Sequence, residues 1–280
     1  MEISNNISPL KNFSNEYKEI ITTLKDGGFT AYDFSMYNGQ IITLEDYIER
    51  AKELREHADK IGIVCNQTHA PFATRKDGDE EYNKRMDMLI KRCIEVSGIL
   101  GAKICVVHPV NGWCAEKNAE MYKGYEDLAK ASKVKIALEN MWNWKKGEDH
   151  ACSAACSHHD DFLKHLSLLN NEVFVACLDI GHAEMKGLET DAVTMIKTLG
   201  KHLQALHIHD NNKLNDNHRL PYSYNIDYGK VITALKEIGY DGDITFESDN
   251  FLLSLPKELV PSGVKFMADM GKYFKSELNK

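Results

Sequence analysis

Several features that would place the chain in a special class of protein are missing from its 280 residues. No stretch approaches the roughly 20 consecutive apolar residues that a membrane-spanning helix needs. Residues 1–6 have neither a basic start nor an apolar core, so we expect no secretory signal. The seven cysteines are an odd number and fall mostly within expected strands and a helix. This usage is typical of small buried residues in a reducing compartment. We therefore expect a cytoplasmic protein without a membrane segment or a disulfide framework.

The sequence also lacks the marks of nucleic-acid-binding and nucleotide-dependent proteins. Lys and Arg number 34 against 42 Asp and Glu, which gives a net charge of −8 with neutral His. An acidic chain is a poor partner for a polyanion, so we expect no nucleic-acid partner. No glycine-rich phosphate loop follows an expected strand, so a nucleotide cofactor is not indicated. No linker, low-complexity tract or repeat divides the chain, and we expect residues 1–280 to form a single domain.

What the sequence does contain is a regular alternation of strand and helix patterns. The expected strands lie within residues 1–10 and at 29–34, 61–67, 103–107, 134–139, 173–179, 203–209 and 243–247. The expected helices lie at 15–26, 44–60, 79–100, 115–132, 160–169, 190–199, 228–238 and 261–278. Dividing 280 residues by eight gives 35 per strand–helix unit, a usual size for this architecture. The pattern predicts an α/β fold, a parallel (β/α)₈ TIM barrel.

Acids and histidines fall repeatedly at the ends of the expected strands. Six apolar runs end in such a residue, namely His69, His108, Glu139, Asp179, His209 and Glu247, with His207 two residues before His209. In a TIM barrel the C-terminal ends of all strands converge on one mouth, where the chemistry takes place. We therefore expect these side chains to meet at one rim.

Strand alternation predicts which way these side chains point. His207 and His209 share one strand face, opposite Leu206 and Ile208. If the apolar pair packs on the helices, both histidines face into the barrel, and the same alternation turns Glu139, Asp179 and Glu247 inward. A buried carboxylate without a partner costs on the order of several kcal/mol, so the cluster needs a cation or protons. The alternative is that these are separate strand-end residues that reach solvent or cap the next helix.

Four short motifs carry a resemblance to a known family. Leu138-Glu139-Asn140, residues 178–183, residues 206–211 and Thr245-Phe246-Glu247 resemble the sugar phosphate isomerase/epimerase superfamily of xylose isomerase-like TIM barrels. That superfamily includes the D-tagatose 3-epimerase group and endonuclease IV. The resemblance implies one divalent metal ion held by Glu139, Asp179, His207 and Glu247. Three carboxylates and one imidazole suit Mn²⁺, Mg²⁺ or Co²⁺, and Zn²⁺ is also compatible.

The activity implied by the resemblance is isomerisation or epimerisation of a small carbohydrate. Such a reaction removes a proton next to a carbonyl, and a cation stabilises the enediolate that forms. Glu139 and Glu247, from the fifth and eighth strands, are the expected catalytic acid and base, and His182 is expected to contact the substrate. A metal-dependent lyase, or a barrel that only binds a sugar or cyclitol derivative, stays open. The sequence decides neither whether the sugar is phosphorylated nor whether the protein is a homo-oligomer.

A second set of residues keeps another function open. His69, His108, His182, Asp216 and His218 match residues that complete a three-zinc centre in endonuclease IV. Together with His209, they are expected to bind substrate or further ions. The alternative function is a zinc phosphodiesterase that acts on abasic DNA. Against it stand the acidic net charge and the lack of a loop rich in Arg and Lys.

The chain also departs from the best-understood epimerases. Those enzymes have a second Glu six residues after the first ligand and an Arg six after the ligand His, where this chain has Lys145 and Lys213. The known ketohexose specificity therefore does not transfer, although Lys213 remains a candidate substrate-binding residue. The segment 141–159 is a candidate lid over the substrate. Trp113 and Trp142 are candidates for stacking on a sugar, with simple packing as the alternative.

Overall fold

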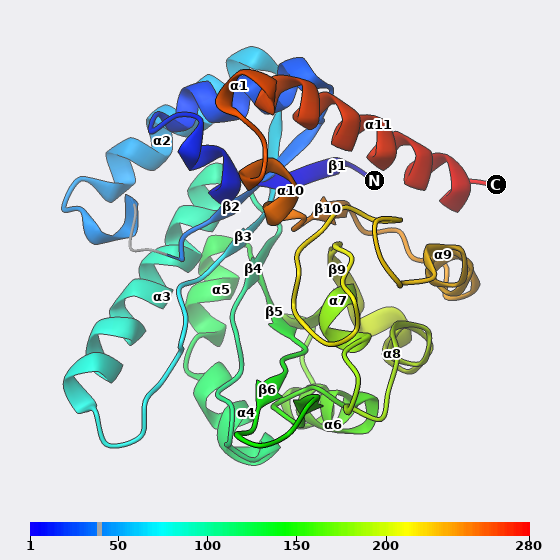
Figure 1. Cartoon of the computed structure of the whole chain (residues 1–280). Coiled ribbons are helices and arrows are strands. Elements are labelled where there is room, and N and C mark those ends of the chain that lie inside the picture. Colours follow the sequence, from blue (N-terminus) through cyan, green and yellow to red (C-terminus); the bar gives the residue numbers. More distant parts are fainter. Residues whose placement is uncertain (38–40) are drawn as a thin grey trace.

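The computed structural model describes residues 1–37 and 41–280, and its strands form the expected TIM barrel (Figure 1). All strand pairs in the large sheet are parallel, and the order is β10-β1-β2-β3-β4-β5-β8-β9. The strands are β1 (Ile3–Asn6), β2 (Ala31–Ser35), β3 (Val64–His69), β4 (Ile104–Val106), β5 (Lys135–Glu139), β8 (Phe174–Asp179), β9 (Leu203–His207) and β10 (Ile244–Phe246).

The barrel closes between β9 and β10 through one residue, Ile208. Its N–H donates to the Thr245 carbonyl at 2.9 Å, and its carbonyl accepts the N–H of Glu247 at 3.1 Å. In the described part of the chain, backbone hydrogen bonds join β9 and β10 only through Ile208. We call this junction the seam.

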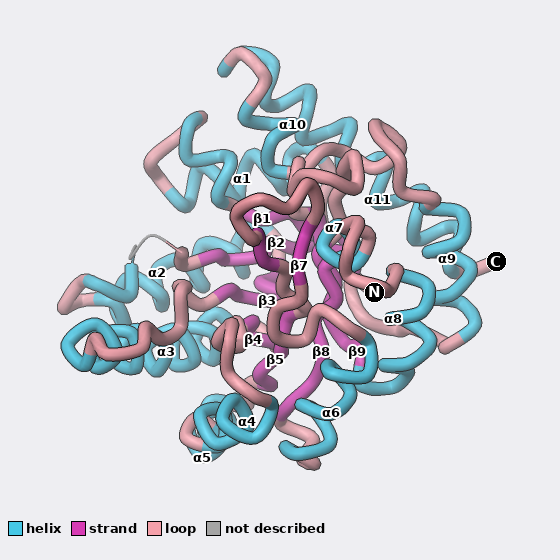
Figure 2. The backbone as a smooth tube through the Cα atoms, turned by 60° about the horizontal axis from the view of Figure 1, so that its bottom comes forward, coloured by secondary structure: helices cyan, strands magenta, loops and turns pink. Residues whose placement is uncertain are grey.

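Helices surround the strands on all sides (Figure 2). The longer ones are α1 (Tyr17–Gly27), α2 (Tyr47–Ile61), α3 (Glu80–Leu100), α4 (Ala115–Lys123), α5 (Glu126–Ser132), α6 (His159–Leu169), α8 (Ala192–Leu199), α9 (Tyr228–Glu237) and α11 (Val260–Leu278). Asp79, Asp191 and Asp227 cap α3, α8 and α9 by accepting a backbone N–H of the first turn. No helix in the described residues is long and apolar enough to span a membrane.

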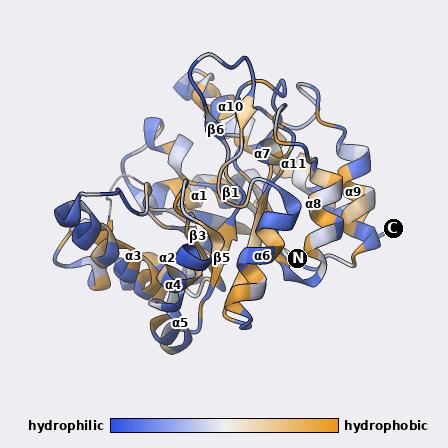
Figure 3. Ribbon diagram, turned by 90° about the horizontal axis from the view of Figure 1, so that it is seen from below, coloured by the Kyte–Doolittle hydropathy of each residue, from blue (hydrophilic) through white to orange (hydrophobic). Residues whose placement is uncertain are grey.

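The hydrophobic residues lie where the helices meet the barrel. Figure 3 shows them gathered in the strands and on the helix sides that face the strands, with hydrophilic residues on the outer sides. Leu206 and Ile208 belong to this layer, as the strand alternation predicted. Their neighbours His207 and His209 consequently face into the barrel.

The inside of the barrel has an apolar half and a polar half. Strands β4, β5, β8 and β9 contribute a buried apolar cluster of Ile104, Val106, Ala137, Val175, Cys177 and Ala205. On the opposite side the buried Gln67 donates to Asp33 at 3.0 Å and accepts from Thr245 at 3.3 Å. A register shift after Tyr32 pairs Asp33 with Gln67, so that β3 carries one extra residue, Asn66. The carboxylate of Asp33 is fully buried beneath the barrel mouth.

Three local expectations differ from the structure. The prediction of one helix over 115–132 is wrong, because the helix is interrupted at Gly124, between α4 and α5. The break turns both Tyr122 and Tyr125 inward, where their hydroxyls reach the Val107 carbonyl and Asp87. The segment 141–159 contains an unpredicted antiparallel pair, β6 (Asn143–Trp144) and β7 (Ala151–Cys152). Two short helices, α7 (Ile180–Ala183) and α10 (Asp249–Leu253), follow strand ends and were also not expected.

Candidate metal centre

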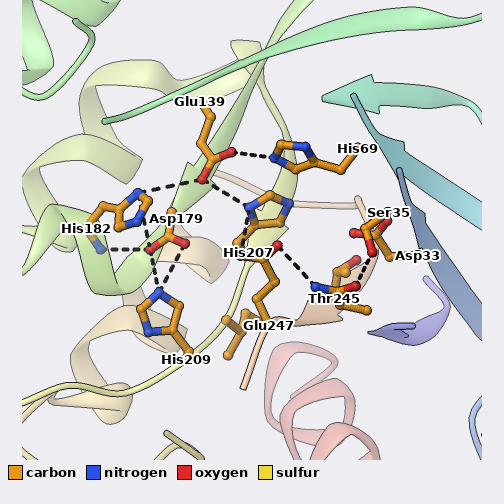
Figure 4. A network of polar contacts seen from close by, with 12 residues as sticks. Asp33, Ser35, His69, Glu139, Asp179, His182, His207, His209, Thr245 and Glu247 are labelled. Carbon is orange, nitrogen blue, oxygen red and sulfur yellow. Dashed lines mark hydrogen bonds and ion pairs between the residues drawn. The ribbon is translucent and has the colours of Figure 1, made fainter. Parts of the chain in front are cut away.

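Four strand ends bring four potential ligands together in the barrel mouth. Glu139, Asp179 and His207 are the last residues of β5, β8 and β9, and Glu247 directly follows β10. The strand register places Asp179 beside His207. One ligand-type atom from each of the four residues lies within 4.8 Å of the others, and all four residues are buried. We call these four residues the first cluster (Figure 4).

The imidazole of His207 lies at the centre of the first cluster. Its Nδ1 is 3.2 Å from Glu139 Oε1 and 3.5 Å from Glu247 Oε2. The angles do not make these contacts hydrogen bonds, so both ring nitrogens of this fully buried side chain lack a partner. A buried polar atom without a partner costs about 1–3 kcal/mol. A cation bound by Nδ1, the nitrogen that faces the two carboxylates, removes the cost at that atom, and the hard oxygen-rich set fits a divalent ion.

The carboxylate of Glu139 is surrounded by imidazoles. His69 Nε2 and His108 Nε2 lie 3.2 and 3.0 Å from its Oε2, and His182 Nδ1 is 3.6 Å from its Oε1. Burial raises the pKa of Glu139, but the neighbouring His207 and His108 outweigh that effect and hold its pKa well below the usual range. Glu139 is therefore an ionised carboxylate inside a ring of histidines.

A second cluster adjoins the first. Ligand-type atoms of His182, His209, Asp216 and His218 also lie within 4.8 Å of one another. Asp216 Oδ2 is 3.2 Å from His182 Nε2 and 3.1 Å from His218 Nε2. His209 Nε2 is 2.9 Å from Asp179 Oδ1, so the Asp179 carboxylate of the first cluster also contacts the second cluster through His209 (Figure 4).

Backbone carbonyls set the orientation of three histidines. The Nδ1 atoms of His69, His182 and His218 donate to the carbonyls of Ala70, Asn140 and Glu247 at 2.8, 2.9 and 2.7 Å. Each Nε2 is thereby left to face the carboxylates. Metal-binding histidines usually show this arrangement, with one ring nitrogen held by the protein and the other free for the ion. Burial lowers the pKa of His182, but the carboxylates of Asp179 and Asp216 outweigh burial and raise it to about 10.

An open cavity of about 360 Å³ gives access to both clusters. Its walls include Glu139, Glu247, Asp216 and several of the histidines, together with Tyr37, Phe72, Met141 and Trp142 from loops and Asp249 from the start of α10. Among the described residues, no Lys or Arg lines this cavity. Tyr37, Phe72 and Asp249 were not predicted, and Met141 was expected only as part of the candidate lid 141–159. Each lies two or three residues after a strand end, and that position was the signal available in the sequence.

Of the three remaining substrate-binding candidates, one lies in the cavity wall and two lie outside it. Trp142 lies in the cavity wall, and its Nε1 donates to Asp216 at 3.4 Å. Trp113 is outside the lining residues, where it donates to Asp77 at 3.0 Å and lies under the Lys117 ammonium. Lys213 is also outside the lining, because its Nζ contacts Glu184 at 2.8 Å.

Comparisons with known proteins agree with the fold. The family model described as xylose isomerase-like TIM barrel matches residues 21–270. The uncharacterized protein MJ1311 of Methanocaldococcus jannaschii is 28% identical over 216 residues, covering 72% of this chain and 69% of that protein.

Two solved structures illustrate the likeness. A D-tagatose 3-epimerase-like protein superimposes with a TM-score of 0.77 at 21% identity, covering 100% of this chain and 98% of the other. An IOLI protein with a bound zinc atom superimposes with a TM-score of 0.73 at 19% identity, covering 99% and 98%. At these identities the likeness to the solved structures shows the fold alone.

Proposed function

The chain belongs to the xylose isomerase-like TIM barrel family, and from that premise we propose that it is a metal-dependent isomerase or epimerase of a small carbohydrate. The observation that carries the proposal is the first cluster, in which buried donor atoms of Glu139, Asp179, His207 and Glu247 converge within 4.8 Å. We propose that these four residues hold one divalent ion, with Mn²⁺, Mg²⁺ or Co²⁺ best suited to the oxygen-rich set and Zn²⁺ also compatible.

The proposed chemistry is proton transfer next to a carbonyl. When bound, the ion supplies positive charge that stabilises the negative oxygen of an enediolate. Glu139 and Glu247 stand at the ends of different strands, β5 and β10, and both line the cavity. We assign to them the removal and return of the proton, because a carboxylate at the reacting carbon can act as base and then as acid. His182 and His108, also in the wall, are proposed to orient substrate hydroxyl groups.

The cavity favours an uncharged sugar over a sugar phosphate. Its lining among the described residues includes the acids Glu139, Asp216, Glu247 and Asp249 but no Lys or Arg. A phosphate group usually finds cationic side chains or backbone N–H groups at its site. Phe72 and Trp142 offer ring faces that suit the apolar face of a sugar.

The second cluster supports a second candidate, a zinc phosphodiesterase. His182, His209, Asp216 and His218 provide the nitrogen-rich donors that Zn²⁺ prefers, next to Asp179 of the first cluster. Among the described residues the lining lacks the Lys and Arg side chains that usually contact a DNA backbone. We therefore rank the phosphodiesterase second.

One experiment separates the two candidates. The protein is incubated in D₂O with a panel of ketoses and aldoses, and deuterium incorporation is followed by NMR while metal per chain is measured by elemental analysis. We expect incorporation into an unphosphorylated sugar and about one ion per chain. Cleavage of an abasic DNA duplex at rates far above any sugar exchange, with three zinc ions per chain, would reverse the ranking.

Two variants test the assigned roles in the same assay. Glu247→Gln is expected to abolish both product and deuterium incorporation, because it removes the group that moves the proton. His182→Ala is expected to weaken substrate use but leave some exchange. Glu258→Gln changes an exposed carboxylate outside the cavity lining and is the control. Equal loss of exchange in all three variants would argue against these roles.

A further inference from the structure

The two carboxylates assigned to proton transfer are held by different kinds of groups. Glu139 is contacted by four imidazoles at 3.0–3.6 Å, those of His69, His108, His182 and His207. Among the described residues, the carboxylate of Glu247 contacts one imidazole, that of His207, through Oε2. Its other oxygen, Oε1, accepts hydrogen bonds from two neutral donors at the ends of β1 and β2, the strands that follow β10 in the sheet order.

The first of these donors is the hydroxyl of Tyr37. Tyr37 follows β2 by two residues, lines the cavity and donates to Glu247 Oε1. Its ring is packed edge-on against His69, with centroids 4.6 Å apart, and lies 5.2 Å from the ring of Phe72. The ring therefore has a defined position, and so does the hydroxyl it carries.

The second donor is the side-chain amide of Asn6, at the end of β1. Its Nδ2 lies 3.5 Å from Glu247 Oε1 and 3.2 Å from Asp249 Oδ2. The orientation of this amide is fixed, because its Oδ1 accepts the Ser8 N–H at 2.9 Å and the Ser35 hydroxyl. Flipping the amide would place Nδ2 against these donors. Both donors to Oε1 are thus held by their own surroundings.

We propose that Tyr37 is a positioning residue for Glu247, an inference that rests on the proposed function. With Asn6, the Tyr37 hydroxyl selects the one orientation of the Glu247 carboxylate in which Oε2 faces His207 and the first cluster. A misplacement of a reacting group by about 1 Å can cost about 100-fold in rate. In the described residues no hydroxyl donor contacts Glu139, so the Tyr37 hydroxyl acts on one of the two carboxylates only.

The test compares Tyr37→Phe with Tyr224→Phe. The first variant removes the hydroxyl and keeps the ring that packs on His69 and Phe72. The second removes the hydroxyl of an exposed tyrosine outside the cavity lining and is the matched control. Thermal melting checks that both variants fold.

The first measurement is Mn²⁺ affinity, by titration of the protein while free Mn²⁺ is followed by electron paramagnetic resonance. Removing a hydrogen bond to a metal-binding carboxylate weakens affinity about 10- to 100-fold. We expect a loss of about tenfold in Tyr37→Phe and no change in Tyr224→Phe. Equal affinity in Tyr37→Phe and the parent protein would overturn the proposal.

The second measurement is deuterium incorporation from D₂O at saturating Mn²⁺, starting separately from each of two interconverting sugars. If Glu139 and Glu247 each abstract the proton from one of the two sugars, Tyr37→Phe should slow exchange about 10- to 100-fold from one sugar and leave the other unchanged. KM should change little in either direction. Equal slowing from both sugars would overturn the proposal, since a general structural defect has that effect.

The two measurements also separate this inference from the proposed function. If the parent protein exchanges no sugar proton, the proposed function fails. The Mn²⁺ affinities alone then decide whether the Tyr37 hydroxyl positions Glu247. If exchange occurs and the affinities do not differ, the proposed function stands and the role of Tyr37 is refuted.

Discussion

The imidazoles around Glu139 make this single carboxylate the link between the strand-end ligands. It contacts His207 of the first cluster and also His69, His108 and His182. We predict that Glu139→Gln removes tight divalent-ion binding and preserves the fold, because a neutral amide no longer balances the charge of the ion. Elemental analysis after dialysis, with circular dichroism as the check on folding, measures this. Full metal occupancy in Glu139→Gln would contradict the ligand assignment, and Glu258→Gln should bind metal as the parent does.

The buried carboxylate of Asp33 predicts a pH dependence of stability. Its Oδ2 accepts one hydrogen bond from Gln67, and its Oδ1 has no partner. Burial raises the pKa of Asp33 from 3.8 to about 6, with His207 and His69 opposing the rise. Because the folded state favours the protonated form, the stabilising effect of that proton is complete below pH 3.8 and is lost as pH rises through about 6.

Asp33→Asn keeps the shape of the protonated acid at every pH. We predict that this variant gains stability relative to the parent by up to roughly 3 kcal/mol between pH 4 and pH 8, as the parent loses its proton. Urea unfolding of chelator-treated protein at a series of pH values measures the difference. A difference that does not change with pH would show that Asp33 is not held protonated in the fold.

At the scale of elements, the turn from β8 into α7 leaves no room for a side chain at Gly181. A Cβ there would lie 1.9 Å from Cε1 of His209, a fully buried ring that contacts Asp179. We predict that Gly181→Ala lowers the free energy of unfolding by about 1–3 kcal/mol, the usual cost of overpacking, and weakens any ion held by the second cluster. Chemical unfolding and Zn²⁺ titration measure the two effects.

Gly229→Ala in α9 is the comparison for Gly181→Ala. A Cβ there would meet only the carboxylate of Asp227, at 3.3 Å. We expect its stability to stay within about 0.5 kcal/mol of the parent. Equal stability of the two variants would show that His209 moves freely.

The strand elements were predictable from the sequence because their alternation has a period of two. That period turned Glu139, Asp179 and His207 inward, and the structure brings them together. The helix break at Gly124 was not predictable, because the tyrosines on either side of it form hydrogen bonds with distant parts of the chain. Tyr122 donates to the Val107 carbonyl after β4, and Tyr125 donates to Asp87 in α3. The roles of the clustered residues remain predictions.

Contacts between side chains from different elements were the part that local patterns do not encode. Asn6, Tyr37 and Asp249 meet around Glu247 from β1, the β2 loop and α10. Their sequence separation from Glu247 ranges from 2 to 241 residues. A strand pattern predicts which face a side chain occupies, whereas its partner depends on strand order and on the register of the closed sheet. For the same reason, the hydrogen bond between Asp33 and Gln67 could not be predicted from the sequence.

For the whole molecule, metal binding and folding should be linked. The first cluster draws its donors from four strands, so the complete set exists only in the folded barrel. We predict that a chelator lowers the melting temperature by several degrees, because an ion at about 100 times its Kd stabilises the fold by about 2.7 kcal/mol. Calorimetry with and without chelator, followed by re-addition of Mn²⁺, measures the shift. Glu139→Gln should show no shift, and a shift of the same size in that variant would contradict the prediction.

The seam between β9 and β10 has a consequence for local opening of the barrel. Because backbone hydrogen bonds cross it only at Ile208 in the described residues, this is where the ring of strands separates with the least loss of pairing. His207, the last residue of β9, and Glu247, directly after β10, lie on the two sides of the seam beside Ile208. An ion bound to both residues would cross-link β9 to β10, and the closed barrel would last longer as the metal occupancy of the site rises. The amide hydrogens of Ile208 and Glu247 would then exchange slowly with solvent while the ion is bound and quickly once it is removed.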